Sequence, residues 1–245
     1  MALRFLLSLT LLFLGSSFSA NVSIGNEINN GSISTYNAVD DLYESLSIPE
    51  LDKKVFEISL AGYFKLWENG QLDNPNYLTI VDFSKASNKE RFFLIDLKNK
   101  TLVDKSLVAH GRNTGNLKAE RFSNIPQSYQ SSLGFYTTAE TYNGKHGFSL
   151  RLDGVEKNFN DKARERAIVI HGADYVSQSF IQTYGRLGRS FGCPSLPEEK
   201  SETIINTIKE KSCLFIYNPN EQYLASSKLI KSDLPKDWYS EVFTN

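Results

Sequence analysis

Cysteine and histidine are scarce in this chain of 245 residues, which has two cysteines and three histidines. The histidines, His110, His146 and His171, do not show the H-x-x-x-H spacing of a zinc site, and the cysteines do not form a C-x-x-C pair. The run from Gly185 to Gly188 lacks the lysine of a phosphate-binding loop. We therefore expect no metal site and no nucleotide or other cofactor.

An excess of either charge is also absent. The chain carries 27 Lys and Arg against 28 Asp and Glu, for a formal net charge of −1. Nucleic-acid-binding domains usually present a basic face, and solvating tails usually contain runs of acidic residues. Neither pattern occurs, so we expect no nucleic-acid partner.

The first residues have the pattern of a secretory signal peptide. Arg4 precedes an apolar run from Phe5 to Leu14, and small residues follow up to Ala20. We predict a signal peptide over residues 1–19, although a buried N-terminal helix would also fit the apolar run. The run is too short to span a bilayer, and no cysteine follows it for lipid attachment. We therefore expect export to the periplasm or cell envelope, without a stable membrane anchor.

The length allows one substantial domain and a small N-terminal element. Residues 20–35 are rich in Asn, Ser and Gly and predict a flexible leader. Residues 36–72 predict a helical element of two helices. The second is predicted to open in a capping box from Ser47 to Glu50 and to end at Asn69-Gly70. Residues 73–245 then form the predicted catalytic domain.

Short apolar runs typical of strands dominate the rest of the chain. A turn is predicted at Lys98-Asn99-Lys100, and a helix capped by Ser195 should bury Ile204, Ile205 and Ile208. We expect a mainly β fold with flanking helices (α+β) and a mostly antiparallel sheet. The predicted strands are Tyr77–Phe83, Arg91–Leu97, Thr101–Ala109, Gly134–Glu140, Phe148–Leu152, Ala167–His171 and Cys213–Tyr217.

Cys193 and His171 each stand beside a glycine, in Gly192-Cys193 and His171-Gly172. A thiol and an imidazole are the minimum parts for covalent acyl transfer, because the imidazole takes the thiol proton and later returns it to the leaving group. With Ser195 as the expected N-cap, Cys193 should lie near the positive end of a helix, which together with His171 favours the thiolate. A disulfide with Cys213 is the alternative in an oxidising compartment, but the apolar run around Cys213 predicts a buried strand.

These residues resemble the signature of YkuD-type L,D-transpeptidases, in which a histidine precedes an S/T-H-G-C motif. The branch described as murein L,D-transpeptidase catalytic domain proteins is the most similar. The resemblance covers roughly residues 75–220 and implies an L,D-transpeptidase-like β-sandwich or mixed sheet. Phe191 replaces the usual histidine and Pro194 follows the cysteine, two departures that concern substrate contacts. The further runs that carry the resemblance are Ala109–Gly115, Phe122–Asn124, Ser131–Gly134 and Ala167–Ala173.

The resemblance implies an exported cysteine acyltransferase that acts on peptidoglycan stem peptides. Cys193 would attack the carbonyl of the third stem residue with His171 as base, and a second stem would accept the acyl group. The backbone carbonyl of Gly172 is expected to orient the imidazole, with Asp174 as its rival. Water as the acceptor would make the protein an L,D-carboxypeptidase or hydrolase, and a non-catalytic cell-wall-binding protein is a third possibility. A carbapenem is expected to acylate the same thiol.

Further residues are predicted to bind substrate. The backbone N–H groups of Gly192 and Cys193 are the expected oxyanion donors, because Pro194 has no N–H. Arg189 could bind a substrate carboxylate in a bidentate contact, with Arg186 as the second candidate. His110 and His146 are each followed by glycine, so they either line the site or mark turns. The remaining predicted substrate contacts are Ser190, Asn124 and Ser132.

Overall fold

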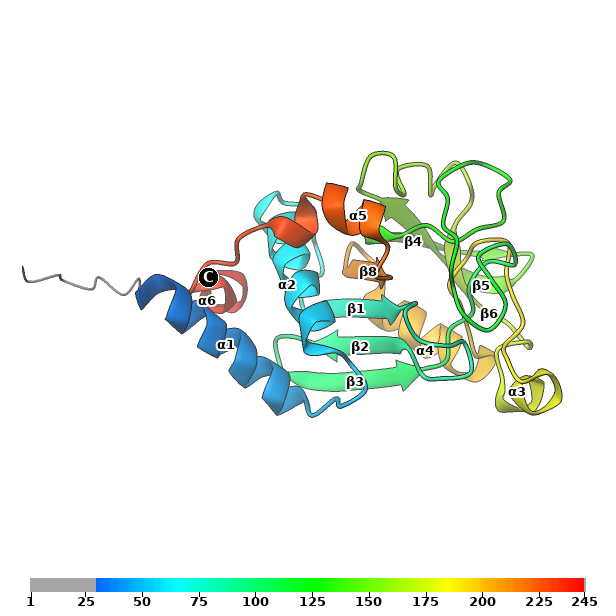
Figure 1. Ribbon diagram of the computed structural model, residues 1–245, viewed down its shortest axis with the longest axis horizontal. Helices are drawn as coiled ribbons and strands as arrows, with labels where there is room; N and C mark the ends of the chain where they lie inside the picture. Colours follow the sequence, from blue (N-terminus) through cyan, green and yellow to red (C-terminus); the bar gives the residue numbers. More distant parts are fainter. Residues whose placement is uncertain (1–29, 245) are drawn as a thin grey trace, which may run out of the picture.

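The structure is a computed structural model that describes residues 30–244, with side chains from residue 38 onward. One eight-stranded mixed sheet, in the order β3-β2-β1-β8-β4-β5-β6-β7, is flanked by helices (Figure 1). The predicted α+β class with a mixed sheet is therefore confirmed. The strands are β1 (Tyr77–Asp82), β2 (Phe92–Asp96), β3 (Thr101–Ser106), β4 (Gly134–Gly144), β5 (Gly147–Gly154), β6 (Val169–Gly172), β7 (Ser195–Leu196) and β8 (Cys213–Tyr217).

The two longest helices precede the strands in the described part of the chain, and the shorter ones follow β6. The predicted signal peptide, residues 1–19, lies outside the described residues. None of the helices in the described part is long and apolar enough to cross a membrane. The helices are α1 (Asn30–Leu46), α2 (Lys53–Glu68), α3 (Gln178–Tyr184), α4 (Glu198–Ile208), α5 (Glu221–Ser226), the 3-10 helix η1 (Leu229–Lys231) and α6 (Trp238–Phe243).

The sheet is mostly antiparallel, as predicted. The parallel pairs are β1–β8 and β6–β7, and the other neighbours are antiparallel. Every residue of β2 is buried, whereas β3, at the end of the sheet, alternates between more and less exposed positions. The predicted turn between β2 and β3 is present, with Lys100 at φ 56° and the carboxylate of Asp96 accepting from the Asn99 N–H at 2.8 Å.

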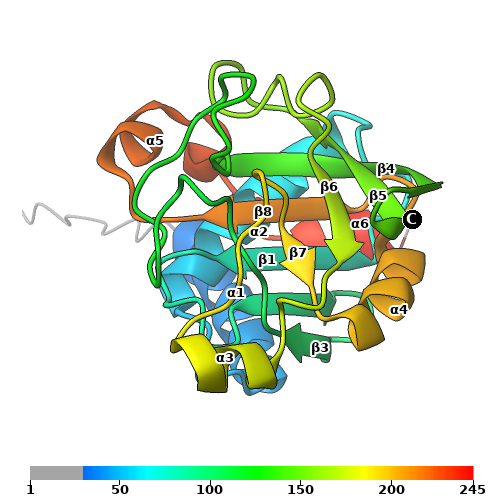
Figure 2. The ribbon, with the colours of Figure 1, turned by 90° about the vertical axis from the view of Figure 1, so that its right-hand side faces the viewer.

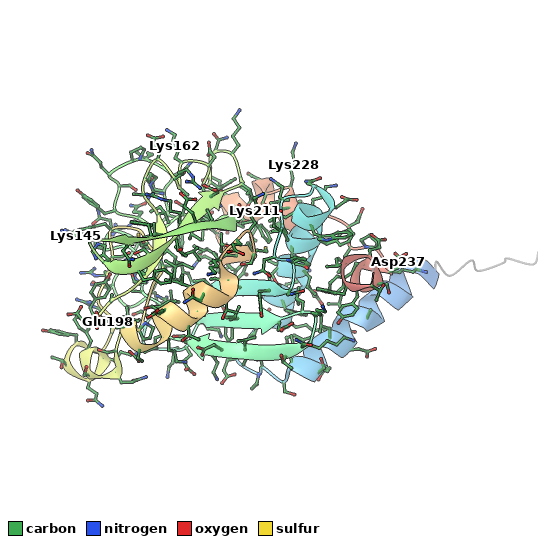
Figure 3. All side chains as sticks on the ribbon, turned by 180° about the vertical axis from the view of Figure 1, so that it is seen from behind. Lys145, Lys162, Glu198, Lys211, Lys228 and Asp237 are labelled. Carbon is green, nitrogen blue, oxygen red and sulfur yellow. The ribbon has the colours of Figure 1, made fainter. Side chains whose placement is uncertain are left out.

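Two helices cover opposite faces of the sheet. Helix α2 packs on β1 and β8, and α4 packs on β5 and β6. Figure 3, seen from behind, shows α4 across the back of the sheet with Glu198 at its first turn, whereas α2 lies in front in Figure 1. The backbone of α2 comes close to β4 at Gly62, where a Cβ atom would lie 2.1 Å from the Phe135 ring. Phe135 in turn stacks on Phe215 of β8 at 4.1 Å, in the centre of the core.

Two helix starts differ from the predictions at the N-terminal end. Helix α1 begins at Asn30, so part of the predicted leader of residues 20–35 is helical. A helix anchored by buried residues further along, such as Leu42, can extend into residues of modest propensity. The N-cap of α2 is Asp52, whose carboxylate accepts from the Val55 N–H at 3.2 Å. The predicted cap, Ser47, has φ 50° directly after α1 and ends that helix instead.

The helix near the site also starts later than predicted. Pro197 is the N-cap of α4, and Ser195 belongs to β7. Ser195 does not cap the helix because its backbone pairs with β6 and its hydroxyl bonds to a histidine. The predicted buried stripe of Ile204, Ile205 and Ile208 is confirmed.

Candidate active site

The parallel strands β6 and β7 carry the candidate site at the end of the molecule opposite α1 and α6 (Figure 1). Figure 2 looks onto this end, with β6 and β7 side by side in front. His171 in β6 is the register partner of Ser195 in β7, and Cys193 lies in the loop that leads into β7. Ala109, which follows β3, also bridges to Ser195. Segments far apart in the sequence thus meet around Cys193 and His171.

His171 is buried and held through both ring nitrogens. Its Nδ1 lies 2.8 Å from the carbonyl oxygen of Gly172, which can only accept, so Nδ1 carries the proton and Nε2 is the acceptor. Burial lowers the pKa of His171, against the raising effect of the Gly172 carbonyl. The ring of His146 stacks on His171 at 4.5 Å. Asp174, the alternative partner in the sequence analysis, is exposed and Gly172 holds the place at Nδ1.

A serine hydroxyl group occupies the other side of the imidazole. Ser195 Oγ lies 2.9 Å from His171 Nε2, and the Tyr175 hydroxyl lies 3.1 Å from Ser195 Oγ. Because Nε2 accepts, the Ser195 hydroxyl donates to it, and Tyr175 donates to Ser195. Burial raises the pKa of Tyr175, which keeps its phenol protonated and able to donate. Tyr175 was not predicted from the sequence, and Ser195 was predicted only as a helix cap, although its position two residues after Cys193 was a signal.

The Cys193 thiol lies against the start of β6. It is half-buried, and its Sγ donates to the carbonyl oxygen of Ala167 at 3.8 Å. Burial raises the pKa of the Cys193 thiol, whereas the Val169 N–H and the Arg166 guanidinium lower it. The thiol is therefore protonated at rest. The expected help from a helix N-terminus is reduced, because α4 starts at Glu198 instead of next to Ser195.

Arg166 is the cation beside this thiol, and it was not predicted from the sequence. Its Nη1 donates to the Ser123 carbonyl at 2.8 Å and to Ser132 Oγ, and its Nη2 donates to the Gln130 carbonyl. Arg166 therefore ties the loop of residues 123–132 to the start of β6. In the sequence it stands in the polar run before a strand, which looks like solvated surface.

The backbone of the Cys193 loop is held by its own hydrogen bonds. The Gly192 N–H donates to Ser190 Oγ at 3.0 Å, and Ser190 Oγ donates to the Cys193 carbonyl at 2.7 Å. Gly192 has φ 130°, and a Cβ atom there would lie 2.9 Å from the Gln130 carbonyl. The Gly192 N–H, predicted to bind an oxyanion, is thus engaged within the loop. The Cys193 N–H, the other predicted oxyanion donor, lowers the pKa of its own thiol.

The family model of the L,D-transpeptidase catalytic domain matches residues 47–217, more than half of the chain. The protein belongs to this family. The family expected from the Cys193 and His171 motifs is therefore confirmed.

Solved structures similar to this L,D-transpeptidase domain are remote. An L,D-transpeptidase from Mycobacterium smegmatis is 10% identical, with 58% of this chain and 59% of that chain covered at a TM-score of 0.36. L,D-transpeptidase 3 from Mycobacterium tuberculosis, in complex with a faropenem-derived adduct, is 12% identical, with 58% and 60% covered at 0.36. The helical cell shape determining protein from Campylobacter jejuni is 16% identical, with 64% and 56% covered at 0.36. The chain thus spans about three fifths of the length of these proteins, and no curated protein matches it.

The two arginines predicted to bind substrate in this L,D-transpeptidase domain have intramolecular partners. Arg189 Nη1 donates to the carbonyls of Arg112 (3.2 Å) and Gly115 (3.1 Å) and to Asn116 Oδ1 (2.8 Å). Arg186 Nη1 donates to the Leu187 carbonyl at 2.7 Å. Arg189 therefore braces the loop after Ala109 with donors that the sequence analysis had assigned to a substrate carboxylate.

Asn124 and Ser132 also hold loops together. The Asn124 amide donates to Asp161 at 2.8 Å and accepts from the Lys162 N–H. Ser132 Oγ donates to the Ser123 carbonyl at 2.8 Å and accepts from Arg166. Neither side chain reaches the thiol directly, but Ser132 acts on it through Arg166.

The three histidines of the L,D-transpeptidase domain have three different surroundings. His110 is fully buried, with its Nδ1 2.9 Å from Arg91 Nη2 and its Nε2 3.3 Å from the Gly115 carbonyl. Burial, followed by the charge of Arg91, lowers the pKa of His110 to about 3. His146 is exposed on the β4–β5 turn, and its ring stacks on that of His171. Lys145, labelled in Figure 3, marks this turn. Of His110 and His146, it is His146 that contacts His171, the candidate base.

The remaining chemistry-bearing groups lie away from the site. Cys213 is buried in β8, as predicted, and both cysteines are free. Among the residues that the structure describes, no cluster of His, Cys, Asp and Glu could hold a metal ion.

Proposed function

We propose that this protein is an exported cysteine acyltransferase that acts on peptidoglycan stem peptides, with Cys193 as nucleophile and His171 as base. Membership of the L,D-transpeptidase family supports the reaction class. The observation that carries the proposal is the fixed imidazole. The Gly172 carbonyl holds His171 with its acceptor nitrogen toward β7, next to the loop that carries Cys193.

Both partners are neutral at rest, because burial raises the pKa of the Cys193 thiol and lowers the pKa of the His171 imidazole. Activation requires the thiol proton to reach His171 Nε2, where Ser195 now donates. In the proposed mechanism the Cys193 side chain turns to Nε2 and displaces the Ser195 hydroxyl, which keeps its contact with Tyr175. The thiolate is then stabilised by the imidazolium and by Arg166.

The thiolate attacks the carbonyl carbon of the third stem residue, and the carbonyl oxygen becomes an oxyanion that faces the Cys193 N–H. When the C–N bond breaks, the His171 imidazolium gives its proton to the departing amine of the terminal D-residue. A thioester on Cys193 remains. The amine of a second stem then loses a proton to His171 and attacks the thioester, which forms the cross-link and restores the thiol.

The test is incubation of the protein, from residue 20 onward, with purified stem peptides, followed by mass spectrometry. A cross-linked dimer supports transpeptidation, whereas a trimmed monomer supports the carboxypeptidase outcome. No product from either wild type or Cys193→Ala would overturn the enzymatic proposal and favour a cell-wall-binding protein. A carbapenem should add one drug mass to wild type and to Cys213→Ser, but not to Cys193→Ala.

Export is a separate part of the proposal and rests on the pattern of residues 1–19. Expression of the full chain in a bacterium with a periplasm, followed by N-terminal sequencing of the recovered protein, tests it. A new N-terminus at Ala20 supports cleavage after Ser19. An intact Met1 on the protein in the cytoplasmic fraction contradicts it.

A further inference from the structure

Three arginines gather beside the Cys193 loop without a carboxylate partner. The pKa of Arg189 is lowered first by burial and then by the charges of Arg186 and Arg112, so each of these two arginines repels the Arg189 guanidinium. Within residues 38–244, none of them forms an ion pair with Asp or Glu. A concentration of uncompensated positive charge beside a nucleophile attracts an anion.

Arg112 is the exposed arginine of the three, whereas Arg186 and Arg189 are partly buried. Arg189 and Arg186 donate to carbonyl groups of the protein. Arg112 is exposed, and its guanidinium carbon lies 5.8 Å from the ring centre of Tyr129 and 5.7 Å from that of Phe191. Such contacts orient the guanidinium while leaving its N–H groups available.

The two rings form an exposed platform under Arg112. Tyr129 and Phe191 are 41% and 62% exposed, and their ring centres lie 5.0 Å apart. Covering aromatic side chains of that exposure with a ligand costs little desolvation free energy. Phe191 is also the residue that replaces the usual histidine of the Cys motif, so the platform depends on a departure from that motif.

The backbone fixes Arg112 to the nucleophile loop. The Arg112 N–H donates to the Ser190 carbonyl at 2.7 Å, and Gly111 forms a parallel bridge with Ser190. A Cβ atom on Gly111 would lie 3.0 Å from the Cα of Gly192, so the two backbones are in direct contact. An anion held by Arg112 is therefore positioned relative to Cys193 by a rigid pair of segments.

We propose that Arg112, seated on Tyr129 and Phe191, binds the free terminal carboxylate of the peptide substrate, on the residue that leaves. A planar guanidinium matches a carboxylate with two parallel hydrogen bonds. This inference rests on the proposed acyl transfer at Cys193. Its consequence is selectivity. A peptide that ends in a free carboxylate acylates Cys193 faster than the same peptide with a terminal amide.

The experiment compares release of the terminal residue from a stem peptide with a free C-terminal carboxylate and from its C-terminal amide. Wild type should prefer the acid at least tenfold in kcat/KM. Arg112→Gln should lose tenfold or more on the acid and little on the amide, so that the preference disappears, while Arg112→Lys should recover part of it. Arg121→Gln removes one exposed positive charge from the neighbouring chain segment and should behave as wild type.

An acid preference that survives in Arg112→Gln, or a loss of the same size in Arg121→Gln, would overturn the inference. Binding separates this failure from failure of the proposed function. The acid peptide is titrated calorimetrically into Cys193→Ala and into the double variant Cys193→Ala with Arg112→Gln. Tighter binding to the single variant supports the carboxylate site even if no turnover is found, and equal binding contradicts it.

Discussion

Ser195 Oγ lies 2.9 Å from His171 Nε2, so the nitrogen that should take the thiol proton is bonded to a hydroxyl in the resting protein. The hydroxyl is itself held by Tyr175 at 3.1 Å. Ser195 therefore stabilises the neutral, Nδ1-protonated imidazole and, in the proposed mechanism, competes with Cys193 for it. This relationship determines how we expect the thiol to respond to substitution.

Replacement of Ser195 by Ala should make the thiol more reactive. The lost hydrogen bond of about 1 kcal/mol leaves Nε2 available to Cys193, and alkylation by iodoacetamide near neutral pH should rise roughly fivefold. Thr203→Ala, at an exposed position of α4, is the control and should leave the rate unchanged. A slower reaction in Ser195→Ala would show that the serine relays the proton instead of competing for it.

The two cysteines should separate activity from stability. Cys193→Ala should abolish turnover, and Cys193→Ser should nearly do so, because a hydroxyl is far less acidic than a thiol. Cys213→Ser should keep most activity but lose about 1–3 kcal/mol of unfolding free energy, because it places a hydroxyl in the buried strand β8. Peptide turnover and urea denaturation measure the two effects. Equal inactivity of Cys213→Ser and Cys193→Ala would contradict the assignment.

Arg166 should tune the Cys193 thiol. Its positive charge lowers the pKa of that thiol, so Arg166→Gln should move the midpoint of the alkylation–pH profile to higher pH. Arg164→Gln serves as the matched control, since Arg164 is exposed and pairs with Glu140 and Asp153. The same profile in wild type and Arg166→Gln would remove Arg166 from the electrostatics of the site.

His146 should act on the pH dependence of His171. Burial, and in smaller part the charge of His146, lowers the pKa of His171 below its usual value of 6.5. The acid limb of kcat/KM in wild type should therefore lie below pH 6.5. In His146→Ala the imidazole gains solvent and loses a neighbouring charge, so the limb should move up toward 6.5. His171→Gln should abolish acylation, and an unchanged limb in His146→Ala would show that the stacked rings are not coupled.

His110 should make the fold sensitive to acid. Its pKa is about 3 in the folded protein because of burial beside Arg91, against 6.5 for an ordinary histidine. Between these values the unfolded chain binds a proton that the folded protein does not, so stability falls as the pH falls, by at most about 1.4 kcal/mol per unit. In urea titrations, the free energy of unfolding of His110→Gln should be lower at pH 7 and should change less with pH over this window. An equally steep curve would place the titrating group elsewhere.

Local patterns in the chain were enough to predict every strand except β7 and to single out the candidate pair of Cys193 and His171. The predicted strands Thr101–Ala109 and Cys213–Tyr217 correspond to β3, which ends earlier at Ser106, and to β8, because the residue types that favour a strand are visible within the strand itself. Cys193 and His171 were recognisable because a thiol and an imidazole beside glycines are rare in this composition. These features are local, so a single segment of sequence is sufficient to show them.

Only the tertiary structure decided what surrounds that pair. Ser195 has the sequence context of a helix cap, but pairing with β6 places its hydroxyl on His171. Arg189 has the context of a substrate arginine, but its guanidinium donates to the backbone of the loop that contains Arg112. The exposed arginine is Arg112 instead. The reason is physical: hydrogen bonds between segments tens of residues apart depend on how strands are ordered in the sheet. That order arises from burial of the whole core, which no local run of residues encodes.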